Sequence, residues 1–594
     1  MTSQFNSFGG RIKLSLSLIA FSFVIFGVRL VNEFNLNHLL IIGLVIIGVS
    51  SYLVHIESDD IIIVSCIFIL SLSLLYHRTL ISNYIIGADV HVEYYWTQKA
   101  IQNTALPEST DHPYASILSV QILYPIIVKV ADINLTDFFK ITYPLLFSVV
   151  PVSTYIIYRR FWTKETAFFA VLIFMFNFLY FKKMAGLVRN GIAEILFVLL
   201  ILAFLKSRDS RFAYLAVILS VGVVVTHYAV SYFLILLFGI GLTTIILMGG
   251  LNFGKINGRL AYPPLVFILI SVVYYTIIHT SGVSKIYGLF LNTLGSFGII
   301  SMSDGGSIHW ATVDLPSVYH QIMRYLFYAS QAGIIIGYLK LSIDKLSSTW
   351  MTRRLEDADI DLYHVLSGGI FVLIFASVTF PALFGKGSFG FPRVYQISLL
   401  IISPYAIIGF KKITGIIASI ADIPSYKTTI STFLLIFLLF NSNVVFEVAG
   451  VYSNSPSISQ DVLDGDENIR NQIMVSSVLL TEHDVHSAKW LKSHNQNGKV
   501  YSDFWAMHGV LTSYGGLRYD DSINTRVATL SGLDNRMNRV SVNDIRTGYV
   551  YLRSFNTRTN LMIDYLTTWE LKKLKVEQRH KIYTNDKSPV YYSQ

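Results

Sequence analysis

Apolar runs of about 18 or more residues recur along most of the chain, and they constrain its fold more than any other feature. A helix of this length crosses the hydrocarbon core of a bilayer, and 53 % of the 594 residues are hydrophobic. We therefore predict an α-helical polytopic membrane protein with about 13 transmembrane helices. The expected spans are residues 13–31, 37–54, 60–76, 137–158, 166–181, 190–205, 212–226, 228–248, 262–279, 318–339, 364–384, 394–410 and 428–447.

The basic residues predict how these spans are oriented. The formal net charge is +9, but most Lys and Arg lie in short loops between spans, where membrane orientation explains them without a nucleic-acid partner. If the ambiguous block 114–133 is a re-entrant or interfacial helix, five basic loops all face the cytoplasm. They contain Arg159, Arg160 and Lys164; Lys206, Arg208 and Arg211; Lys255 and Arg259; Lys345, Arg353 and Arg354; and Lys411, Lys412 and Lys427. We thus expect a multi-pass protein of the plasma membrane with a cytoplasmic N-terminus.

The composition changes after Asn443, where long apolar runs stop and Asp, Asn, Ser and Arg become frequent. Residues 1–447 are the expected transmembrane domain, with a large first outer loop at 77–113, and residues 448–594 the expected soluble extracytoplasmic domain. The spacing of this second part predicts a helix at 485–494 and strands at 499–503, 548–553 and 581–592, the last pair joined at Asn585-Asp586. These elements indicate an α/β or α+β fold. The single cysteine, Cys66, offers neither a disulfide nor a Cys-type zinc site.

The first outer loop carries the densest cluster of titratable residues. Asp89, His91 and Glu93 share one face if the backbone is extended, whereas on a helix Asp89 and Glu93 align and His91 turns aside. Either geometry can bring carboxylates to one point. The alternative is that Asp89 caps a helix starting near Val90 and that the aromatic residues after Glu93 lie in the membrane interface.

Cations at the predicted outer ends of spans are unusual, because Lys and Arg are normally enriched in cytoplasmic loops. Lys182, Lys183 and Arg189 crowd a short outer turn, and Arg393 enters a span from outside. Such cations favour an anionic partner, and a lipid phosphate is the nearest candidate. The two lysines can also simply extend to lipid headgroups, whereas a planar guanidinium suits a phosphate.

Three further pairs or single residues are weaker candidates. Asp111 and His112 end the first outer loop, and His227 lies in an outer turn, where a histidine is more often structural than catalytic. Asp304 and His309 occur in a glycine-rich stretch that could close over a substrate.

This layout resembles the glycosyltransferase-C superfamily: an acidic first outer loop with Asp-x-His-x-Glu, many spans, an outer re-entrant segment, basic residues at outer span ends and a C-terminal outer domain. Within it, the chain is most similar to archaeal predicted membrane proteins with runs such as GADVHVEYYW, LVRNGIAEILF, THYAVSYF, FPRVYQISLL and AKWLKSHNQNGKVYSDFWAMHGVLTSYGGL. Such enzymes transfer a sugar from a polyprenyl-phosphate or diphosphate carrier to an acceptor at the outer face. By this resemblance Asp89 matches the catalytic acidic residue of their first outer loop. The oligosaccharyltransferase branch has a Trp-Trp-Asp-Tyr-Gly motif, where this chain has only Ser502-Asp503-Phe504-Trp505, which argues against transfer to peptide asparagine.

The chemistry of glycosyl transfer fits these residues. A base must take the proton of the acceptor hydroxyl, and cations must stabilise the leaving phosphate. Asp89 is the expected base, with Glu93 or His91 tuning it or, with Asp89, holding a divalent ion such as Mg²⁺ or Mn²⁺. Arg189 and Arg393, assisted by Lys182 and Lys183, are the expected phosphate ligands.

The expected partners are the bilayer, a polyprenyl-phosphate-linked sugar and an acceptor glycan, lipid or protein. Two other classes stay open: a transporter or flippase for a lipid-linked sugar, and a non-catalytic scaffold in cell-envelope assembly. Transporters usually have internal repeats around a midplane site, and no such repeat is visible in the sequence.

Overall fold

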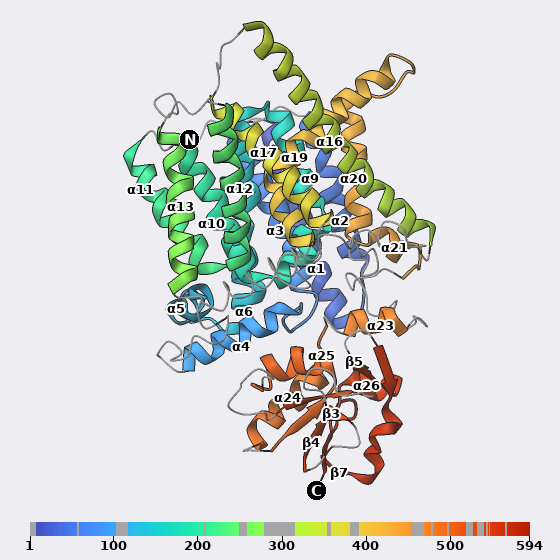
Figure 1. Ribbon diagram of the computed structural model, residues 1–594. Coiled ribbons are helices and arrows are strands. Elements are labelled where there is room, and N and C mark those ends of the chain that lie inside the picture. Colours follow the sequence, from blue (N-terminus) through green and yellow to red (C-terminus); the bar gives the residue numbers. More distant parts are fainter. Residues whose placement is uncertain are drawn as a thin grey trace.

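The structure, a computed structural model, consists of a bundle of long helices with a smaller sheet-containing domain at one end (Figure 1). It describes residues 8–55, 59–102, 114, 117–206, 209–248, 258–277, 315, 317–352, 358–379, 391–452, 469–476, 479–495, 498–517, 527–531, 540–541, 545, 547–564 and 567–593.

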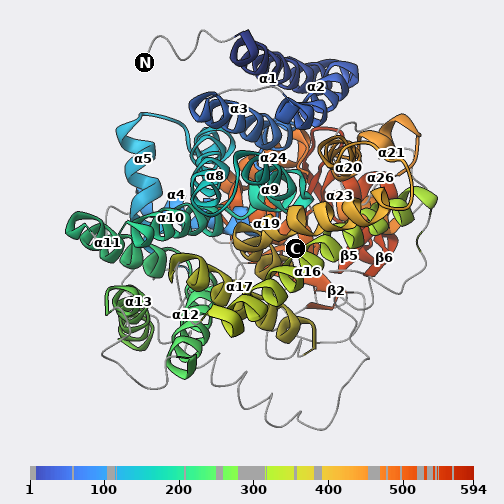
Figure 2. The ribbon, with the colours of Figure 1, turned by 90° about the horizontal axis from the view of Figure 1, so that it is seen from above.

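Long helices rich in Leu, Ile, Val and Phe form the bundle, because in an apolar environment a helix satisfies its own backbone hydrogen bonds. They are α1 (Phe8–Phe34), α2 (His38–Val49), α3 (Asp60–Thr79), α8 (Val149–Phe161), α9 (Lys164–Phe176), α10 (Val188–Leu205), α11 (Ser210–Thr226), α12 (Tyr228–Met248), α13 (Gly258–Ile277), α16 (Val318–Thr352), α17 (Ala358–Thr379), α19 (Phe391–Ala418) and α20 (Tyr426–Asn441). Shorter turns adjoin some of them: η2 (Ser50–His55), α6 (Leu135–Asp137), η4 (Phe138–Thr142), α7 (Tyr143–Phe147) and α21 (Val444–Val448). Seen from above, α9 and α19 lie near the centre, and α1, α2, α11 and α13 lie at the periphery (Figure 2).

A helix occupies each segment that the sequence assigns to a span. Among the described residues, 6 helices are long and apolar enough to cross a membrane, or 7 if the bent pair Lys164–Phe176 and Leu179–Gly186 is one span. Shorter apolar helices, such as Ser210–Thr226, lie beside them. The mostly helical architecture with several candidate spans is therefore confirmed, while the total of about 13 spans and their orientation stay predictions.

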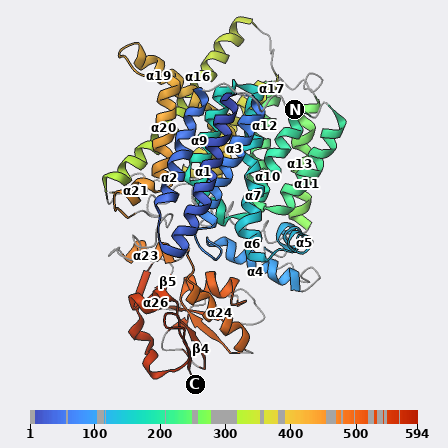
Figure 3. The same cartoon turned by 180° about the vertical axis from the view of Figure 1, so that it is seen from behind.

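Ion pairs that involve basic residues of the predicted cytoplasmic loops lie at one end of the bundle. At one end, Arg159 and Lys164 lie 3.4 and 3.6 Å from the carboxylate of Asp60, and Lys427 pairs with Glu165. All three basic residues belong to loops predicted to be cytoplasmic. Because α3 runs from Asp60 at this end to the loop that precedes α4 (Asp89–Gln102), α4 lies at the opposite end, together with the C-terminal domain (Figures 1 and 3).

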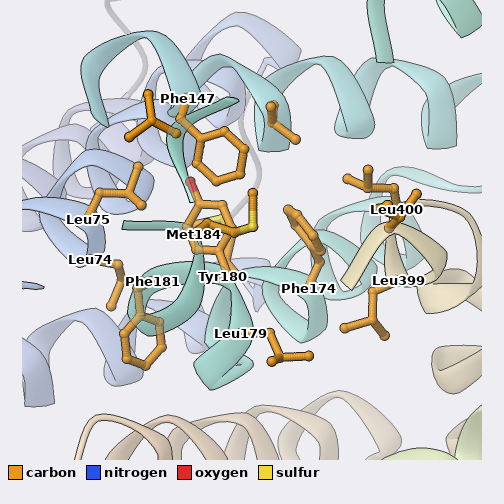
Figure 4. Packing of buried hydrophobic residues seen from close by; sticks show 14 of the residues in the cluster. Leu74, Leu75, Phe147, Phe174, Leu179, Tyr180, Phe181, Met184, Leu399 and Leu400 are labelled. Carbon is orange, nitrogen blue, oxygen red and sulfur yellow. The ribbon is translucent and has the colours of Figure 1, made fainter. Parts of the chain in front are cut away.

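The long helix that starts with α9 bends by 52° at Asn177. The Asn177 side chain accepts a hydrogen bond from the backbone N–H of Leu179 at 3.0 Å, which starts a new segment. That segment is the π-helix η5 (Leu179–Lys183) followed by the turn η6 (Met184–Gly186). Its apolar residues pack in the centre of the bundle (Figure 4) against neighbours that include Leu74, Phe147 and Leu399. This packing fixes the position of the two lysines that end η5.

The helix from Ser119 to Val130, which comprises η3 (Ser119–Leu123) and α5 (Tyr124–Val130), lies beside α4 at the end of the bundle that faces the C-terminal domain (Figure 3). Its 12 residues span about 18 Å, too short for a hydrocarbon core of about 30 Å. The apolar side chains of Ile126 and Val130 are exposed. These features agree with an interfacial helix within the predicted block 114–133.

The C-terminal part of the chain contains a six-stranded mixed sheet in the order β3-β2-β1-β4-β8-β7. Strands β1 to β4 pair in parallel, and β8 is antiparallel to both β4 and β7. The strands are β1 (Val500–Ser502), β2 (Val527–Ser531), β3 (Val540–Ser541), β4 (Gly548–Tyr551), β7 (His580–Tyr583) and β8 (Val590–Ser593), with a separate hairpin of β5 (Leu561–Asp564) and β6 (Thr567–Glu570). The helices are α23 (Ile469–Ser476), α24 (Glu482–His494), α25 (Phe504–Ala506), η7 (Met507–Leu511), α26 (Ser554–Thr559), η9 (Leu571–Leu574) and η10 (Val576–Gln578).

This arrangement is α/β with an antiparallel edge. The predicted helix at 485–494 is part of α24, and the predicted strands correspond to β1, β4 and the β7–β8 pair. Strands β2, β3, β5 and β6 were not predicted.

Candidate functional site

Helix α4 positions the acidic residues of the first outer loop. Asp89 is its first residue, and Glu93 follows one turn later on the same face. Of the two geometries that the sequence allows, the structure therefore has the helical one. Asp89 lies at the N-terminal end of the helix, where the helix dipole stabilises a negative charge.

Two glycines fix the start of α4 against the bundle. Gly87 has a φ of +136°, which favours glycine, and a Cβ placed there would lie 2.8 Å from the Cα of Gly186 in η6. A Cβ on Gly186 would in turn lie 3.1 Å from the Cα of Gly87. The loop before α4 thus crosses η6 in direct backbone contact, which places Asp89 near the end of η5 and the start of α10.

Asp89 forms an ion pair with Arg393, near the start of α19. The two side chains are 33 % and 20 % exposed, so solvent or a ligand can reach them. Lys183, the last residue of η5, is exposed and interacts electrostatically with both Asp89 and Arg393. These three residues form an accessible charged cluster with one acid and two cations.

Glu93 forms a second, buried pair with Arg189 at the start of α10. Its Oε2 accepts a hydrogen bond from the Arg189 backbone N–H at 3.0 Å, and its Oε1 lies 3.3 Å from Arg189 Nε. The Glu93 side chain is 0 % exposed and that of Arg189 is 5 % exposed. Burial raises the pKa of Glu93 to about 7, and the positive charge of Arg189 limits this rise.

Aromatic rings surround the Arg189 guanidinium. Its Cζ lies 4.1 Å from the centre of the Tyr114 ring and 5.7 Å from that of Tyr228, both within cation–π range. His227 stacks on Tyr228, and its Nδ1 accepts the backbone N–H of Val230 at 3.2 Å. Burial keeps the pKa of His227 well below its usual value, so this residue is a neutral cap between α11 and α12.

His91 points away from Asp89 and Glu93 and contacts the C-terminal domain. Its Nδ1 lies 2.9 Å from Ser513 Oγ, and because Ser513 donates to the Gly509 carbonyl, His91 is the donor in this bond. Burial lowers the pKa of His91 to about 3, so the ring is neutral. Helix geometry turns His91 to the side of α4 opposite to Asp89 and Glu93, and its expected role in tuning Asp89 or binding a metal stays a prediction.

Tyr514 extends this contact. Its ring lies 5.5 and 5.3 Å from those of Tyr84 and Tyr94, and its hydroxyl accepts the backbone N–H of Ile85 at 3.3 Å. Lys492 adds a hydrogen bond to Gln98 at 3.2 Å. The C-terminal domain thus contacts α4 and the loop before it, on the side of α4 opposite to Asp89 and Glu93.

Lys182 points away from the charged cluster. Its ammonium group donates to the side chain of Asn443 at 2.8 Å and so ties η5 to the end of α20. Of the two lysines, only Lys183 is thus placed beside Asp89 and Arg393, and phosphate binding by either stays a prediction. Asp503, within the Ser502-Asp503-Phe504-Trp505 segment, is also structural: it is fully buried and accepts hydrogen bonds from Ala506 N and Asn556 Nδ2, each at 2.7 Å.

Four candidates, Asp111, His112, Asp304 and His309, lie outside the described residues. Within the described part of the chain, no group of three or more His, Cys, Asp or Glu residues could hold a metal ion. Asp89 and Glu93 are each paired with an arginine. This donor set does not fit a divalent cation bound by Asp89 and Glu93. The chemistry proposed below therefore involves no such ion.

Sequence reasoning missed the residues that position the charges: Gly87, Gly186, Tyr114, Tyr228, Ser513 and Tyr514. The only signal was that Tyr228 follows His227 in an outer turn and that a glycine precedes α4. Nothing local to residues 513 and 514 relates them to a loop more than 400 positions earlier, since the His91–Ser513 separation is 422 residues.

The family model described as "Predicted membrane protein (DUF2206)" matches residues 213–594. No curated protein matches the chain. ArnT from Cupriavidus metallidurans, bound to undecaprenyl phosphate, aligns at 10 % identity and a TM-score of 0.47, covering 90 % of this chain and 97 % of that one. The oligosaccharyltransferase of Archaeoglobus fulgidus in the apo form aligns at 10 % identity and a TM-score of 0.39, covering 76 % and 64 %.

Proposed function

The chain belongs to the DUF2206 family of predicted membrane proteins, and we propose that it is a membrane glycosyltransferase. It transfers a sugar from a polyprenyl-phosphate or polyprenyl-diphosphate carrier to a glycan, lipid or protein acceptor at the outer face of the membrane. The observation that carries this proposal is the accessible cluster of Asp89, Arg393 and Lys183 at the end of the bundle where α4 lies.

The cluster has the charges that glycosyl transfer needs. The bond between the sugar C1 and the phosphate oxygen breaks, and the acceptor oxygen forms a bond to C1. The proton of the acceptor hydroxyl goes to the Asp89 carboxylate, which acts as the general base. The carrier phosphate leaves with the electrons of the broken bond, and Arg393 and Lys183 stabilise its charge.

The Asp89–Arg393 pair couples two steps, because binding of the donor phosphate to Arg393 also activates Asp89 as the base. In the structure, Arg393 donates to the carboxylate that must accept the proton. A phosphate that binds Arg393 competes for the same guanidinium and frees a carboxylate oxygen of Asp89. Because both side chains are partly exposed, a phosphate can reach the Arg393 guanidinium and take the place of the carboxylate.

The buried Glu93–Arg189 pair has a different role. Tyr114 and Glu93 fix the plane of the Arg189 guanidinium, and among the described residues its Nη1 has no hydrogen-bond partner. This nitrogen is a second donor for a phosphate oxygen. Glu93 is thus a positioning residue, and Asp89 is the residue that contacts the acceptor.

The test is the initial rate of transfer from a polyprenyl-phosphate sugar in proteoliposomes by the Asp89→Asn variant. We expect the rate to fall by roughly 10² to 10⁴, because the proton acceptor is lost. The matched control is Asp137→Asn, since Asp137 is an exposed acid at the same end of the bundle and outside the cluster. Thermal unfolding of each variant, measured in parallel, separates lost chemistry from lost folding.

Two outcomes would contradict the proposal. Normal turnover in a folded Asp89→Asn variant would remove Asp89 as the base. Movement of the lipid-linked sugar across the vesicle membrane without any transfer product would instead identify a flippase.

A further inference from the structure

The chain contains one tripeptide of the kind that carries N-linked glycans. Attachment of a glycan to asparagine requires Asn-x-Ser/Thr with x other than proline, and the sequence contains it once, as Asn134-Leu135-Thr136. Such a tripeptide also arises by chance, so the motif alone does not identify a modified residue. Its exposure, the hydrogen bonds of its side chain and its side of the membrane decide whether a transferring enzyme can use it.

The amide nitrogen of Asn134 is accessible. Asn134 lies in the turn between α5 and α6, and its side chain is exposed. Its Oδ1 accepts a hydrogen bond from the Thr136 backbone N–H at 2.8 Å. Within the described part of the chain, its Nδ2 has no hydrogen-bond partner. The atom that would bond to a sugar is therefore open to solvent, while the oxygen of the same amide is held.

Capping of α6 is the structural role of Asn134. Asn, Asp and Ser cap helices about equally well, because each accepts a backbone N–H through a side-chain oxygen. Of these three residue types, only asparagine also has an amide nitrogen. Capping and glycan attachment therefore use different atoms of the side chain, and an aspartate at this position would separate the two roles.

The position of Asn134 along the bundle places it outside the hydrocarbon core. The helical segment Leu135–Phe161 is a candidate span, and near its far end Arg159 lies 3.4 Å from Asp60, at the end predicted to be cytoplasmic. Its 27 residues are about 40 Å long, about 10 Å more than the hydrocarbon core of a bilayer. Its first turn, α6, lies at the same end as α4 (Figure 3). By the predicted orientation, Asn134 therefore faces the outside.

We propose that Asn134 carries an N-linked glycan at the outer face of the membrane. A bond forms between Asn134 Nδ2 and C1 of the sugar, and the bond between C1 and the phosphate of a lipid carrier breaks. The phosphate leaves with the electron pair of this bond, and the amide nitrogen gives one proton to a base of the transferring enzyme. That enzyme is a separate oligosaccharyltransferase, and this chain is its acceptor. The inference rests on the predicted orientation and does not depend on the proposed transferase activity.

The test is mass spectrometry of the full-length protein purified from its native cells. Trypsin cleavage after Lys129 and Lys140 releases the peptide Val130–Lys140, in which Asn134 is the only asparagine. We expect this peptide to carry the added mass of one or more sugars, and fragmentation to place that mass on Asn134. An unmodified peptide, or a sugar on Thr136 instead, would overturn the proposal.

Three variants separate glycan attachment from capping. Asn134→Asp keeps the oxygen that accepts the Thr136 N–H, so the protein should fold as the wild type does while the added mass is lost completely. Thr136→Ser keeps the tripeptide and should keep the added mass, whereas Thr136→Val should lose it. Thermal unfolding, measured in parallel, shows whether each variant is folded. An added mass that persists in Asn134→Asp or in Thr136→Val would contradict attachment at Asn134.

Discussion

Replacing Glu93 by glutamine should make the protein more stable than the wild type at pH 8, with the gain disappearing toward pH 5. Burial raises the pKa of this carboxyl from its ordinary value of 4.5 to about 7. Between pH 4.5 and about 7, this carboxyl group is therefore protonated in the folded protein and ionised in the unfolded chain. The stability that Glu93 contributes is complete below pH 4.5 and is lost as the pH rises through about 7.

The magnitude follows from the same two values. The difference between 4.5 and about 7 corresponds to about 3 kcal/mol at 25 °C. Solvent does not screen this effect, since the side chain is 0 % exposed. Glutamine keeps the oxygen that accepts the Arg189 backbone N–H, so it mimics the protonated acid and should recover most of this energy. Replacing a buried ion pair by a neutral partner is stabilising when desolvation exceeds the attraction between the charges.

The assay is thermal unfolding in detergent at pH 5 and pH 8 for the wild type, Glu93→Gln and the control Glu165→Gln. The free energy of unfolding of Glu93→Gln should exceed that of the wild type by at most about 1 kcal/mol at pH 5 and by about 3 kcal/mol at pH 8. Glu165→Gln, in a partly exposed pair with Lys427, should be no more stable than the wild type at either pH. If Glu93→Gln is several kcal/mol less stable at pH 8, the attraction of Arg189 outweighs burial and the reasoning is refuted.

Three other predictions concern donor binding, the domain contact and the topology. Arg393→Lys keeps the charge but loses the planar guanidinium, which can donate two parallel hydrogen bonds to a phosphate, so KM for the lipid-linked donor should rise about tenfold. The control Arg211→Lys should leave this KM unchanged. An unchanged KM in Arg393→Lys would leave Arg393 as a structural residue. Tyr514→Ala should expose the loop before α4 to proteolysis, whereas Tyr514→Phe, which keeps the ring, should protect it, and equal cleavage of both would contradict the contact as drawn. With Cys66 replaced by serine, a cysteine at position 585 should react with an impermeant reagent on intact cells and one at position 353 should not; labelling at 353 would refute the orientation.

Local patterns in the sequence predicted the helices of the bundle well. The apolar runs have the length and composition of spans, and a helix occupies each of them. The i, i+4 spacing of Asp89 and Glu93 also allowed a shared helical face, which the structure has. The sequence did not exclude the extended alternative, because three titratable residues at alternate positions fit both geometries.

Adjacent residues of one chemical type were harder to separate. Lys182 and Lys183 are identical in composition and neighbours in sequence, yet one binds Asn443 and the other faces the charged cluster. Neighbouring side chains of η5 point in different directions, and which partner each lysine meets depends on how η5 packs in the bundle. For the same reason, the pairing of Asp89 with Arg393, 304 residues apart, was not predicted, and the sequence assigned the two residues separate roles as base and phosphate ligand.

The contact between α4 and the C-terminal domain has a consequence for synthesis. Ser513 and Tyr514, which contact α4 and the loop before it, are synthesised more than 400 residues later. The separation between Ile85 and Tyr514 is 429 residues. Chains fold from the N-terminus as they are produced. The loop that carries Asp89 is therefore made long before its partner exists. A chain that stops before residue 513 lacks the contacts of Ser513 and Tyr514 with α4 and the loop before it.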